Sequence, residues 1–198
     1  MAGDDLIAWA SKASGNGVPL DSVRQQTPYT CGPAVLVAVL RYFGKGADER
    51  SIAEEADSNP NGTTFDAMER VLKHHGLTIE RRDDLDAQSI KGLLAQGALV
   101  VVALQAWRDP LPPAGGYAGE WNEGHYVAPV AVDDEVVLFE DPAVAGRRSY
   151  LTSNEFAVRW HSSDSDGTYL PGFGLVVRST APVVWGKLAK LKKPVRMG

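Results

Sequence analysis

The chain has 198 residues, of which 44% are hydrophobic and 23% are charged, as expected for one globular domain with a sizeable core. Its formal net charge of −5 at pH 7 argues against nucleic acid as the main partner, because phosphate binding requires a basic face. The single cysteine excludes an intramolecular disulfide, and the sequence contains neither a basic signal segment nor an apolar run of ~20 residues. We therefore expect a cytoplasmic protein without a membrane span.

Three segments are expected along the chain. Residues 1–22 are predicted to form an N-terminal arm, with a short helix from Asp5 to Lys12 and then a turn-rich linker. Residues 23–180 are predicted to form the folded domain. Residues 181–198 form a basic tail, for which a solvated conformation is favoured over contact with a membrane or a partner.

The most apolar helix is predicted directly after the only cysteine, Cys31. Pro33 suits the first turn of this helix and Gly44 suits its C-terminal cap. Cys31 is therefore placed at the helix N-terminus, where unpaired backbone N–H groups and the helix dipole favour the thiolate that a nucleophile requires. The alternative is that Cys31 is a small buried hydrophobic residue, as most free cysteines are.

A glutamine precedes this cysteine by six residues. The Thr-Pro pair between them turns the chain, so the side-chain amide of Gln25 is expected beside the sulfur. Together with the backbone N–H of Cys31 it would stabilise the negative oxygen of a tetrahedral intermediate. Gln26 competes for this role, and a solvated glutamine is the simpler alternative.

Helices come first in the next part of the chain and strands follow. Helices are predicted over residues 48–56, 65–75 and 86–96, and strands over residues 77–81 and 98–105, the last of them fully buried. His74 and His75 fall at a helix C-terminus, where the dipole favours a cation, and no further role is assigned to them.

A long loop rich in proline, glycine and tryptophan spans residues 106–124. Its aromatic residues Trp107, Tyr117 and Trp121 are candidates for lining a peptide groove, and Gly124 at its end is included among the candidate substrate-binding residues. The alternative is a surface loop folded on its own aromatic side chains.

Two β-rich runs, residues 125–132 and 136–142, are joined by a short acidic turn and predict a hairpin. In such a hairpin paired residue numbers sum to about 266–268, so His125 and Asp141 are neighbours. A carboxylate beside an imidazole fixes the tautomer of a catalytic base. Pro129 lacks a backbone N–H and indicates an edge position or a bulge.

The remaining residues predict a helix from Thr152 to Trp160 and a closing strand over residues 171–178. His161, with Asp164 and Asp166 nearby, is a second candidate base or metal contact, but its expected loop position favours a surface role.

Four of these motifs, in this order and spacing, resemble the papain-like cysteine peptidases of the bacteriocin-processing, double-glycine type. The resemblance covers about residues 23–178, includes Gly62-Thr63-Thr64, and rests on Gln25, Cys31-Gly32-Pro33-Ala34, Gly124-His125-Tyr126-Val127 and Glu140-Asp141-Pro142. It implies an α+β fold in which the N-terminal cysteine helix packs on a C-terminal antiparallel sheet. Family members cleave after a Gly-Gly at the end of a leader peptide, and this chain is expected to be a free-standing member.

The resemblance implies that Cys31 is the nucleophile, His125 the general acid and base, Asp141 the orienting carboxylate and Gln25 the oxyanion donor. The expected function is hydrolysis of a peptide bond in a peptide or protein substrate through a thioester. The alternatives are an acyltransferase on the same fold and a non-catalytic peptide-binding module. No metal or organic cofactor is suggested, and the oligomeric state stays open.

Overall fold

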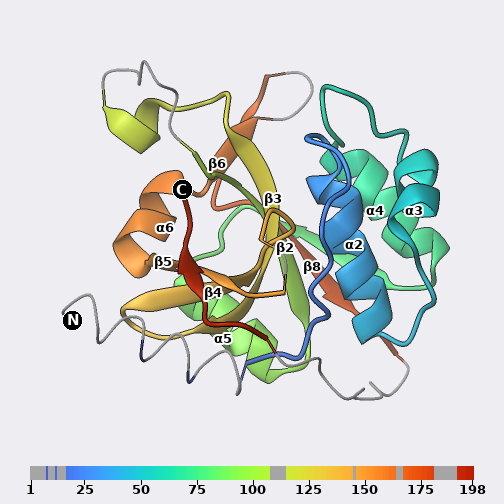
Figure 1. Cartoon of the computed structure of the whole chain (residues 1–198), viewed down its shortest axis with the longest axis horizontal. Coiled ribbons are helices and arrows are strands. Elements are labelled where there is room, and N and C mark those ends of the chain that lie inside the picture. The colour runs from blue at the N-terminus through green and yellow to red at the C-terminus, as the bar shows by residue number, and fades with distance from the viewer. Residues whose placement is uncertain are drawn as a thin grey trace.

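The computed structural model describes residues 17–107, 115–144, 146–163, 167–180 and 191–198, together with Ala8 and Lys12. Most of the helix expected over residues 5–12 lies outside these ranges. The architecture is α+β, as predicted: one large, almost entirely antiparallel sheet stands between two groups of helices (Figure 1). None of the helices in the described parts of the chain is long and apolar enough to cross a membrane.

The sheet has seven strands in the order β1-β8-β2-β3-β4-β5-β9, and a separate ribbon pairs β6 with β7. The strands are β1 Thr78–Arg82, β2 Leu99–Gln105, β3 Gly124–Val132, β4 Val136–Glu140, β5 Ser149–Thr152, β6 His161–Ser163, β7 Tyr169–Pro171, β8 Gly174–Arg178 and β9 Val195–Arg196. The helices are α2 Cys31–Tyr42, α3 Glu49–Glu55, α4 Phe65–His74, α5 Ala87–Ala95 and α6 Ser153–Arg159, with a 3-10 turn η1 Gly116–Gly119.

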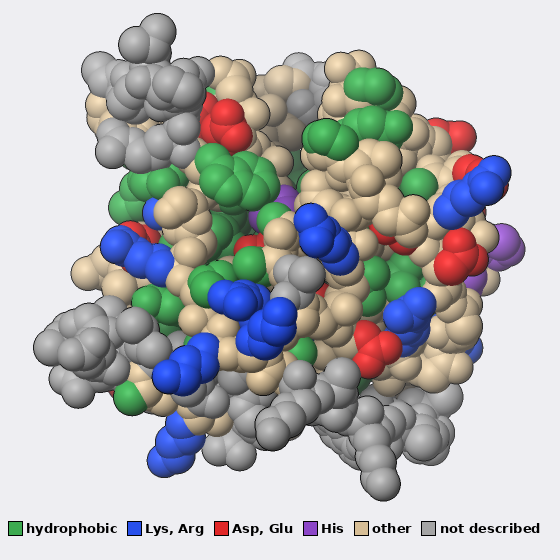
Figure 2. Space-filling model, viewed as in Figure 1, with side chains coloured by type: hydrophobic (Ala, Val, Ile, Leu, Met, Phe, Trp, Pro, Cys, Tyr) green, Lys and Arg blue, Asp and Glu red, His purple; other side chains and the backbone are tan. Residues whose placement is uncertain are grey.

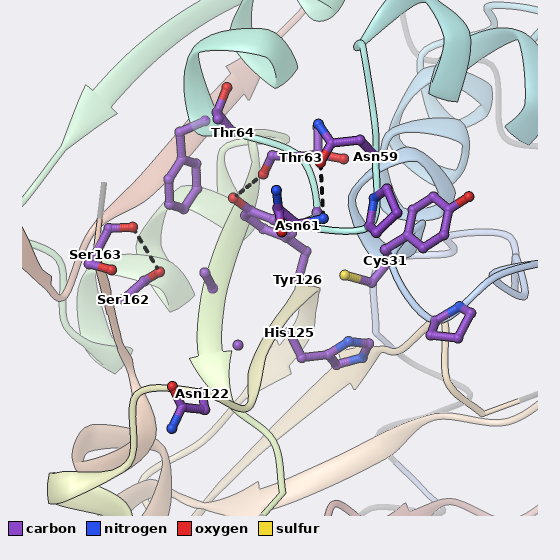
Figure 3. A pocket seen from close by; sticks show the side chains of 17 residues that line it. Cys31, Asn59, Asn61, Thr63, Thr64, Asn122, His125, Tyr126, Ser162 and Ser163 are labelled. Carbon is purple, nitrogen blue, oxygen red and sulfur yellow. Dashed lines mark hydrogen bonds between the residues drawn. The ribbon is translucent and has the colours of Figure 1, made fainter. Parts of the chain in front are cut away.

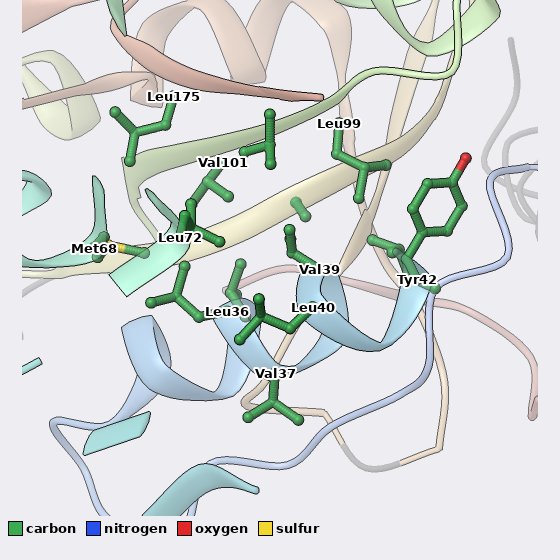
Figure 4. Packing of buried hydrophobic residues seen from close by; sticks show 14 of the residues in the cluster. Leu36, Val37, Val39, Leu40, Tyr42, Met68, Leu72, Leu99, Val101 and Leu175 are labelled. Carbon is green, nitrogen blue, oxygen red and sulfur yellow. The ribbon is translucent and has the colours of Figure 1, made fainter. Parts of the chain in front are cut away.

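Helix α2 is the centre of one core. Its residues 34–40 are fully buried, and α3 and α4 cover its outer side. Side chains such as Leu36 and Val39 point from α2 toward Val101 and Leu175 on the sheet (Figure 4). Because each buried valine or leucine side chain contributes about 1.5–3 kcal/mol, this packing fixes the position of the helix that begins at Cys31.

Strand β2 is buried at every residue because both of its faces are covered. Leu99, Val101 and Ala103 belong to the core under α2, whereas Val100 and Val102 belong to a second core under α5 and α6. The prediction of a fully buried strand is therefore confirmed, and it explains why the sequence of β2 shows no alternation.

The hairpin of β3 and β4 carries a register shift between Pro129 and Ala131. Residue pairs before the shift sum to 268, as in Ala128 with Glu140, and those after it sum to 269, as in Val132 with Val137. Since β3 lies between β2 and β4, Pro129 is accommodated by a bulge and not by an edge position.

Parts of both terminal segments pack on the sheet. Val18 donates its backbone N–H to Val130 at 2.8 Å, and Leu20 is fully buried. At the other end β9 pairs in parallel with β5, and Met197 is buried. The expectation of a solvated tail is therefore wrong for the residues around β9, because backbone hydrogen bonds and an apolar side chain hold them.

Candidate active site

The nucleophile candidate lies where a tight loop runs into α2. Thr27 and Thr30 close this loop by hydrogen bonds to each other, and Cys31 is the first helical residue. Only 8% of Cys31 is exposed, and the backbone N–H groups of Tyr126 and Gly32 act to lower the pKa of its thiol. The helix N-terminus and a neighbouring strand thus supply donors to the sulfur, as thiolate stabilisation requires.

The structure places His125 and Asp141 in contact, as the hairpin predicts. His125 Nε2 lies 2.8 Å from Asp141 Oδ1, and both side chains are almost completely buried. The backbone N–H of Ala143 donates to the same carboxylate oxygen at 2.9 Å. Cys31 and His125 line the same pocket side by side, and each of them shifts the pKa of the other (Figure 3).

The pKa shifts of Cys31, His125 and Asp141 are coupled to one another. Burial raises the pKa of Cys31, but its hydrogen bond to His125 and the imidazolium charge bring it below its usual value. Burial also lowers the pKa of His125, yet Asp141 and Cys31 outweigh this and raise it to about 9. For Asp141 burial raises the pKa, and the hydrogen bond from His125 lowers it below its usual value. A thiolate, an imidazolium and a carboxylate are the forms that these directions favour.

The pocket beside Cys31 has a volume of about 680 Å³. One wall is residues 59–64 of the segment between α3 and α4 together with Phe65, and the opposite side includes Asn122, Gly124, Ser162 and Ser163 (Figure 3). Apart from Cys31 and His125, the residues that line the pocket have neutral side chains, so they offer polar and apolar contacts to a bound peptide.

A close contact joins this wall to the start of α2. A Cβ atom on Gly32 would lie 3.1 Å from Thr63 Cβ, so a larger residue at this position would require Thr63 to move by a few tenths of an ångström. Thr63 is held in turn, because its carbonyl accepts the Tyr126 hydroxyl at 2.8 Å and its own hydroxyl lies 2.7 Å from Ser58 Oγ.

Gln25 is anchored close to the pair but does not line the pocket. Its backbone N–H donates to the carbonyl of Pro142 at 3.1 Å, and its side-chain Nε2 donates to the carbonyl of Thr27 at 2.8 Å. Gln26 is exposed and donates its backbone N–H to Glu49 on α3. Of the two glutamines, Gln25 is therefore the one fixed beside Asp141.

Of the four predicted substrate-binding residues, Gly124 lines the pocket and the three aromatic residues do not. The Trp107 ring instead packs against His125, with ring centroids 4.9 Å apart. Tyr117 packs under the guanidinium of Arg159 at 3.6 Å. Trp121 contacts His161 and Tyr169. In the described part of the loop these aromatic side chains therefore contact other elements, an arrangement that the composition of the loop did not distinguish from a peptide groove.

The expectation of a surface role for His161 is wrong. His161 is 3% exposed, and its Nε2 and Nδ1 atoms lie 2.8 and 3.1 Å from the carbonyl oxygens of Glu120 and Val158. It joins α6 to the segment before β3. Asp164 and Asp166 lie outside the described residues.

Sequence reasoning missed a buried ion pair next to the site. Glu140 and Arg148 are in contact and nearly unexposed. Glu140 Oε1 also accepts the backbone N–H of Val23 at 2.9 Å, and Arg148 donates to the carbonyl of Leu20. The pair thus fixes the segment that leads to Gln25. The available signal was a glutamate at the end of the otherwise apolar strand β4.

Comparisons with known proteins show which family the chain belongs to. The chain is 30% identical over 122 residues to an uncharacterised protein of Methanothermobacter marburgensis, a match that covers 62% of this chain and 71% of that protein. The peptidase domain of Streptococcus ComA, a bi-functional ABC transporter involved in quorum sensing, superposes with a TM-score of 0.60 at 16% identity, over 80% of this chain and 97% of the other.

A double glycine motif protease from an AMS/PCAT transporter, solved in complex with the leader peptide, superposes with a TM-score of 0.58 at 15% identity, over 83% of this chain and 94% of the other. The model of the peptidase C39 family matches residues 20–163, which include Cys31, His125 and Asp141. The chain therefore belongs to the peptidase C39 family.

Proposed function

We propose that this protein is a cysteine peptidase that hydrolyses a peptide bond through Cys31, His125 and Asp141. The observation that carries the proposal is the position of His125, whose Nε2 lies 2.8 Å from Asp141 Oδ1 and which lines one pocket together with Cys31, whose pKa it lowers. A nucleophile, a base and an orienting group connected in this order are the arrangement that covalent acyl transfer needs.

In the first half of the reaction the Cys31 thiolate attacks the substrate carbonyl carbon. The negative oxygen then accepts hydrogen bonds from the backbone N–H of Cys31 and from the side-chain amide of Gln25. An amide NH₂ has two hydrogens, and Thr27 takes one of those of Gln25, which leaves the other for the oxyanion. His125 gives its proton to the leaving amine, the C–N bond breaks, and a thioester remains.

In the second half His125, now neutral, takes a proton from water. The resulting hydroxide attacks the thioester carbonyl, the C–S bond breaks, and a carboxylic acid is released together with the Cys31 thiolate. Asp141 stabilises the imidazolium and keeps the ring oriented in both steps.

We further infer that the substrates are leader peptides. This is supported by the family and by the likeness of fold to a double glycine motif protease that was solved with its leader peptide. The pocket beside Cys31 is open enough for an extended peptide segment.

The experiment is incubation of the protein with a library of leader-like peptides, with and without Gly-Gly, followed by mass spectrometry of the products. Cleavage by the wild type and none by C31A supports the proposal. A product with a free carboxylate indicates hydrolysis, whereas a product joined to an added amine indicates acyl transfer.

The ionisation state of the Cys31 thiol distinguishes a peptidase from a non-catalytic peptide-binding module. A peptidase site predicts rapid alkylation of Cys31 by iodoacetamide at pH 6, since the thiolate is present there. Equal alkylation rates in folded and unfolded protein at pH 6, with peptide binding but no cleavage, would replace the proposal with a binding module.

A further inference from the structure

A cluster of two histidines and a glutamate lies away from the catalytic pair, where the ends of α3 and α4 meet. Glu55 is the last residue of α3, His74 is the last residue of α4, and His75 follows as its cap. His74 Nδ1 lies 2.6 Å from Glu55 Oε1, and His75 Nε2 lies 3.1 Å from Glu55 Oε2. Figure 2 shows histidine atoms at the surface on this edge of the molecule, between acidic and basic groups.

Two consecutive residues on a helix point about 100° apart, so two consecutive histidines do not ordinarily contact the same group. His75 is the C-cap that follows His74, the two rings are tilted by 56° with centroids 5.5 Å apart, and each ring presents one nitrogen to the Glu55 carboxylate. One ligand atom from each of the three residues lies within 4.8 Å of the others.

Glu55 is also at an unfavourable position for helix α3 on its own. A carboxylate at a helix C-terminus is repelled by the negative end of the dipole, and the last turn of α3 contains no basic residue. Arg70 of α4 donates to the backbone carbonyl of Glu55, but its ion pair is with the carboxylate of Asp57. A cation bound at the Glu55 carboxylate would meet the carbonyl ends of two helices.

We propose that Glu55, His74 and His75 bind one divalent transition-metal ion of the zinc class. Two imidazole nitrogens and one carboxylate oxygen are a ligand set that zinc uses, and water completes the tetrahedron. Ligand atoms around such an ion stand about 3.4 Å apart, so small rotations of the partly exposed side chains complete the site. Magnesium and calcium prefer oxygen ligands and do not suit it.

The position of the site suggests what a bound ion does. The segment between α3 and α4 begins directly after Glu55 and supplies residues 59–64 of the pocket wall near Cys31. An ion that joins the end of α3 to the end of α4 would restrain this segment at its base and stabilise the folded state. This inference does not depend on the proposed peptidase activity.

The test uses the full chain with Cys31→Ala, because a thiolate beside an imidazole binds zinc by itself. ZnCl₂ is titrated by calorimetry at pH 8, and CoCl₂ is added separately for its visible absorption. We expect one site per chain, a cobalt spectrum typical of tetrahedral nitrogen and oxygen ligands, and an increase in Tm of roughly 5 °C at a hundredfold excess over Kd.

The variants E55Q and H75A, each in the C31A background, are expected to weaken zinc binding by at least about tenfold. H74A gives the same result without disturbing the core, since the His74 side chain is 75% exposed. The matched control is E54Q, because Glu54 is the preceding acid and pairs with Arg50. No zinc binding in C31A, equal binding in C31A and C31A/E55Q, or displacement of zinc by equimolar magnesium would each overturn the proposal.

Discussion

The Trp107 ring packs on the His125 ring with their centroids 4.9 Å apart and their planes tilted by 52°. Trp107 is 39% exposed, whereas His125 is 2% exposed, so the indole forms the boundary between the imidazole and solvent. The hydrogen bond from His125 to Asp141 is therefore kept in a site of low dielectric constant, where it is stronger than in water.

Removal of this cover by W107A is expected to reduce kcat/KM for peptide cleavage roughly tenfold, equivalent to about 1.4 kcal/mol. The reason is that water then competes for the hydrogen bond between His125 and Asp141. W107F retains a ring over His125 and should keep most of the activity. Equal losses in both variants would indicate that Trp107 acts through specific contacts of its indole and not as a cover.

The activity is expected to depend on pH as a bell-shaped curve. At low pH activity falls as Cys31 gains a proton, and this limb lies below the usual cysteine pKa of 9.0 because the pKa of Cys31 is lowered. At high pH it falls as His125 loses the proton that it gives to the leaving amine, near its raised pKa of about 9. The pH dependence of kcat/KM tests both limbs.

The matching variant is H125A, examined by the rate of Cys31 alkylation between pH 5 and 10. Without the imidazolium the pKa of Cys31 should rise, so alkylation at pH 6 slows while alkylation at pH 10 is little changed. Identical alkylation profiles for H125A and the wild type would contradict the ion pair.

Gln25 and Gln26 provide a matched pair for the oxyanion role. Q25A should reduce kcat by about 10²–10³ with little change in KM, because an oxyanion donor acts mainly in the transition state. Q26A should have nearly normal activity, since the side chain of Gln26 is exposed. Comparable losses in the two variants would show that the loop and not the Gln25 amide matters.

Gly32 is predicted to be sensitive to a single added carbon. In G32A the new Cβ would lie 3.1 Å from Thr63 Cβ, and Thr63 is held by Ser58 and Tyr126. We expect a loss of about 1–3 kcal/mol in the free energy of unfolding. The control is G92A in α5, where a Cβ meets nothing within 4 Å and should stabilise the helix by up to about 1 kcal/mol. Urea unfolding measures both.

The buried pair of Glu140 and Arg148 should be costly to break from one side only. E140Q leaves an uncompensated buried guanidinium and should reduce the free energy of unfolding by about 3–5 kcal/mol. The double variant E140L/R148M removes both charges and should be less destabilising than E140Q. If the double variant is the less stable of the two, as measured by urea unfolding, charge isolation is not the cause.

Local sequence signals were sufficient to predict those parts of the candidate site whose residues lie close together in the sequence. Pro33 and Gly44 mark the ends of the apolar helix, so Cys31 was expected at its N-terminus, and α2 begins at Cys31. Two β-rich runs and the short acidic turn between them predict the β3–β4 hairpin, which brings His125 next to Asp141 although the bulge near Pro129 shifts the pairing by one.

The tertiary structure decided what depends on residues far apart in the chain. Trp107 covers His125. The ion pair of Glu140 with Arg148 holds the segment before Gln25, and the absence of a side chain at Gly32 leaves room for Thr63. The composition of a loop does not predict which residue its tryptophan contacts. The basic residues of the tail likewise do not predict that β9 pairs with β5. Local propensity and hydrophobic period depend on neighbours within a few residues, whereas these contacts form only when the sheet is assembled and its buried polar groups find their partners.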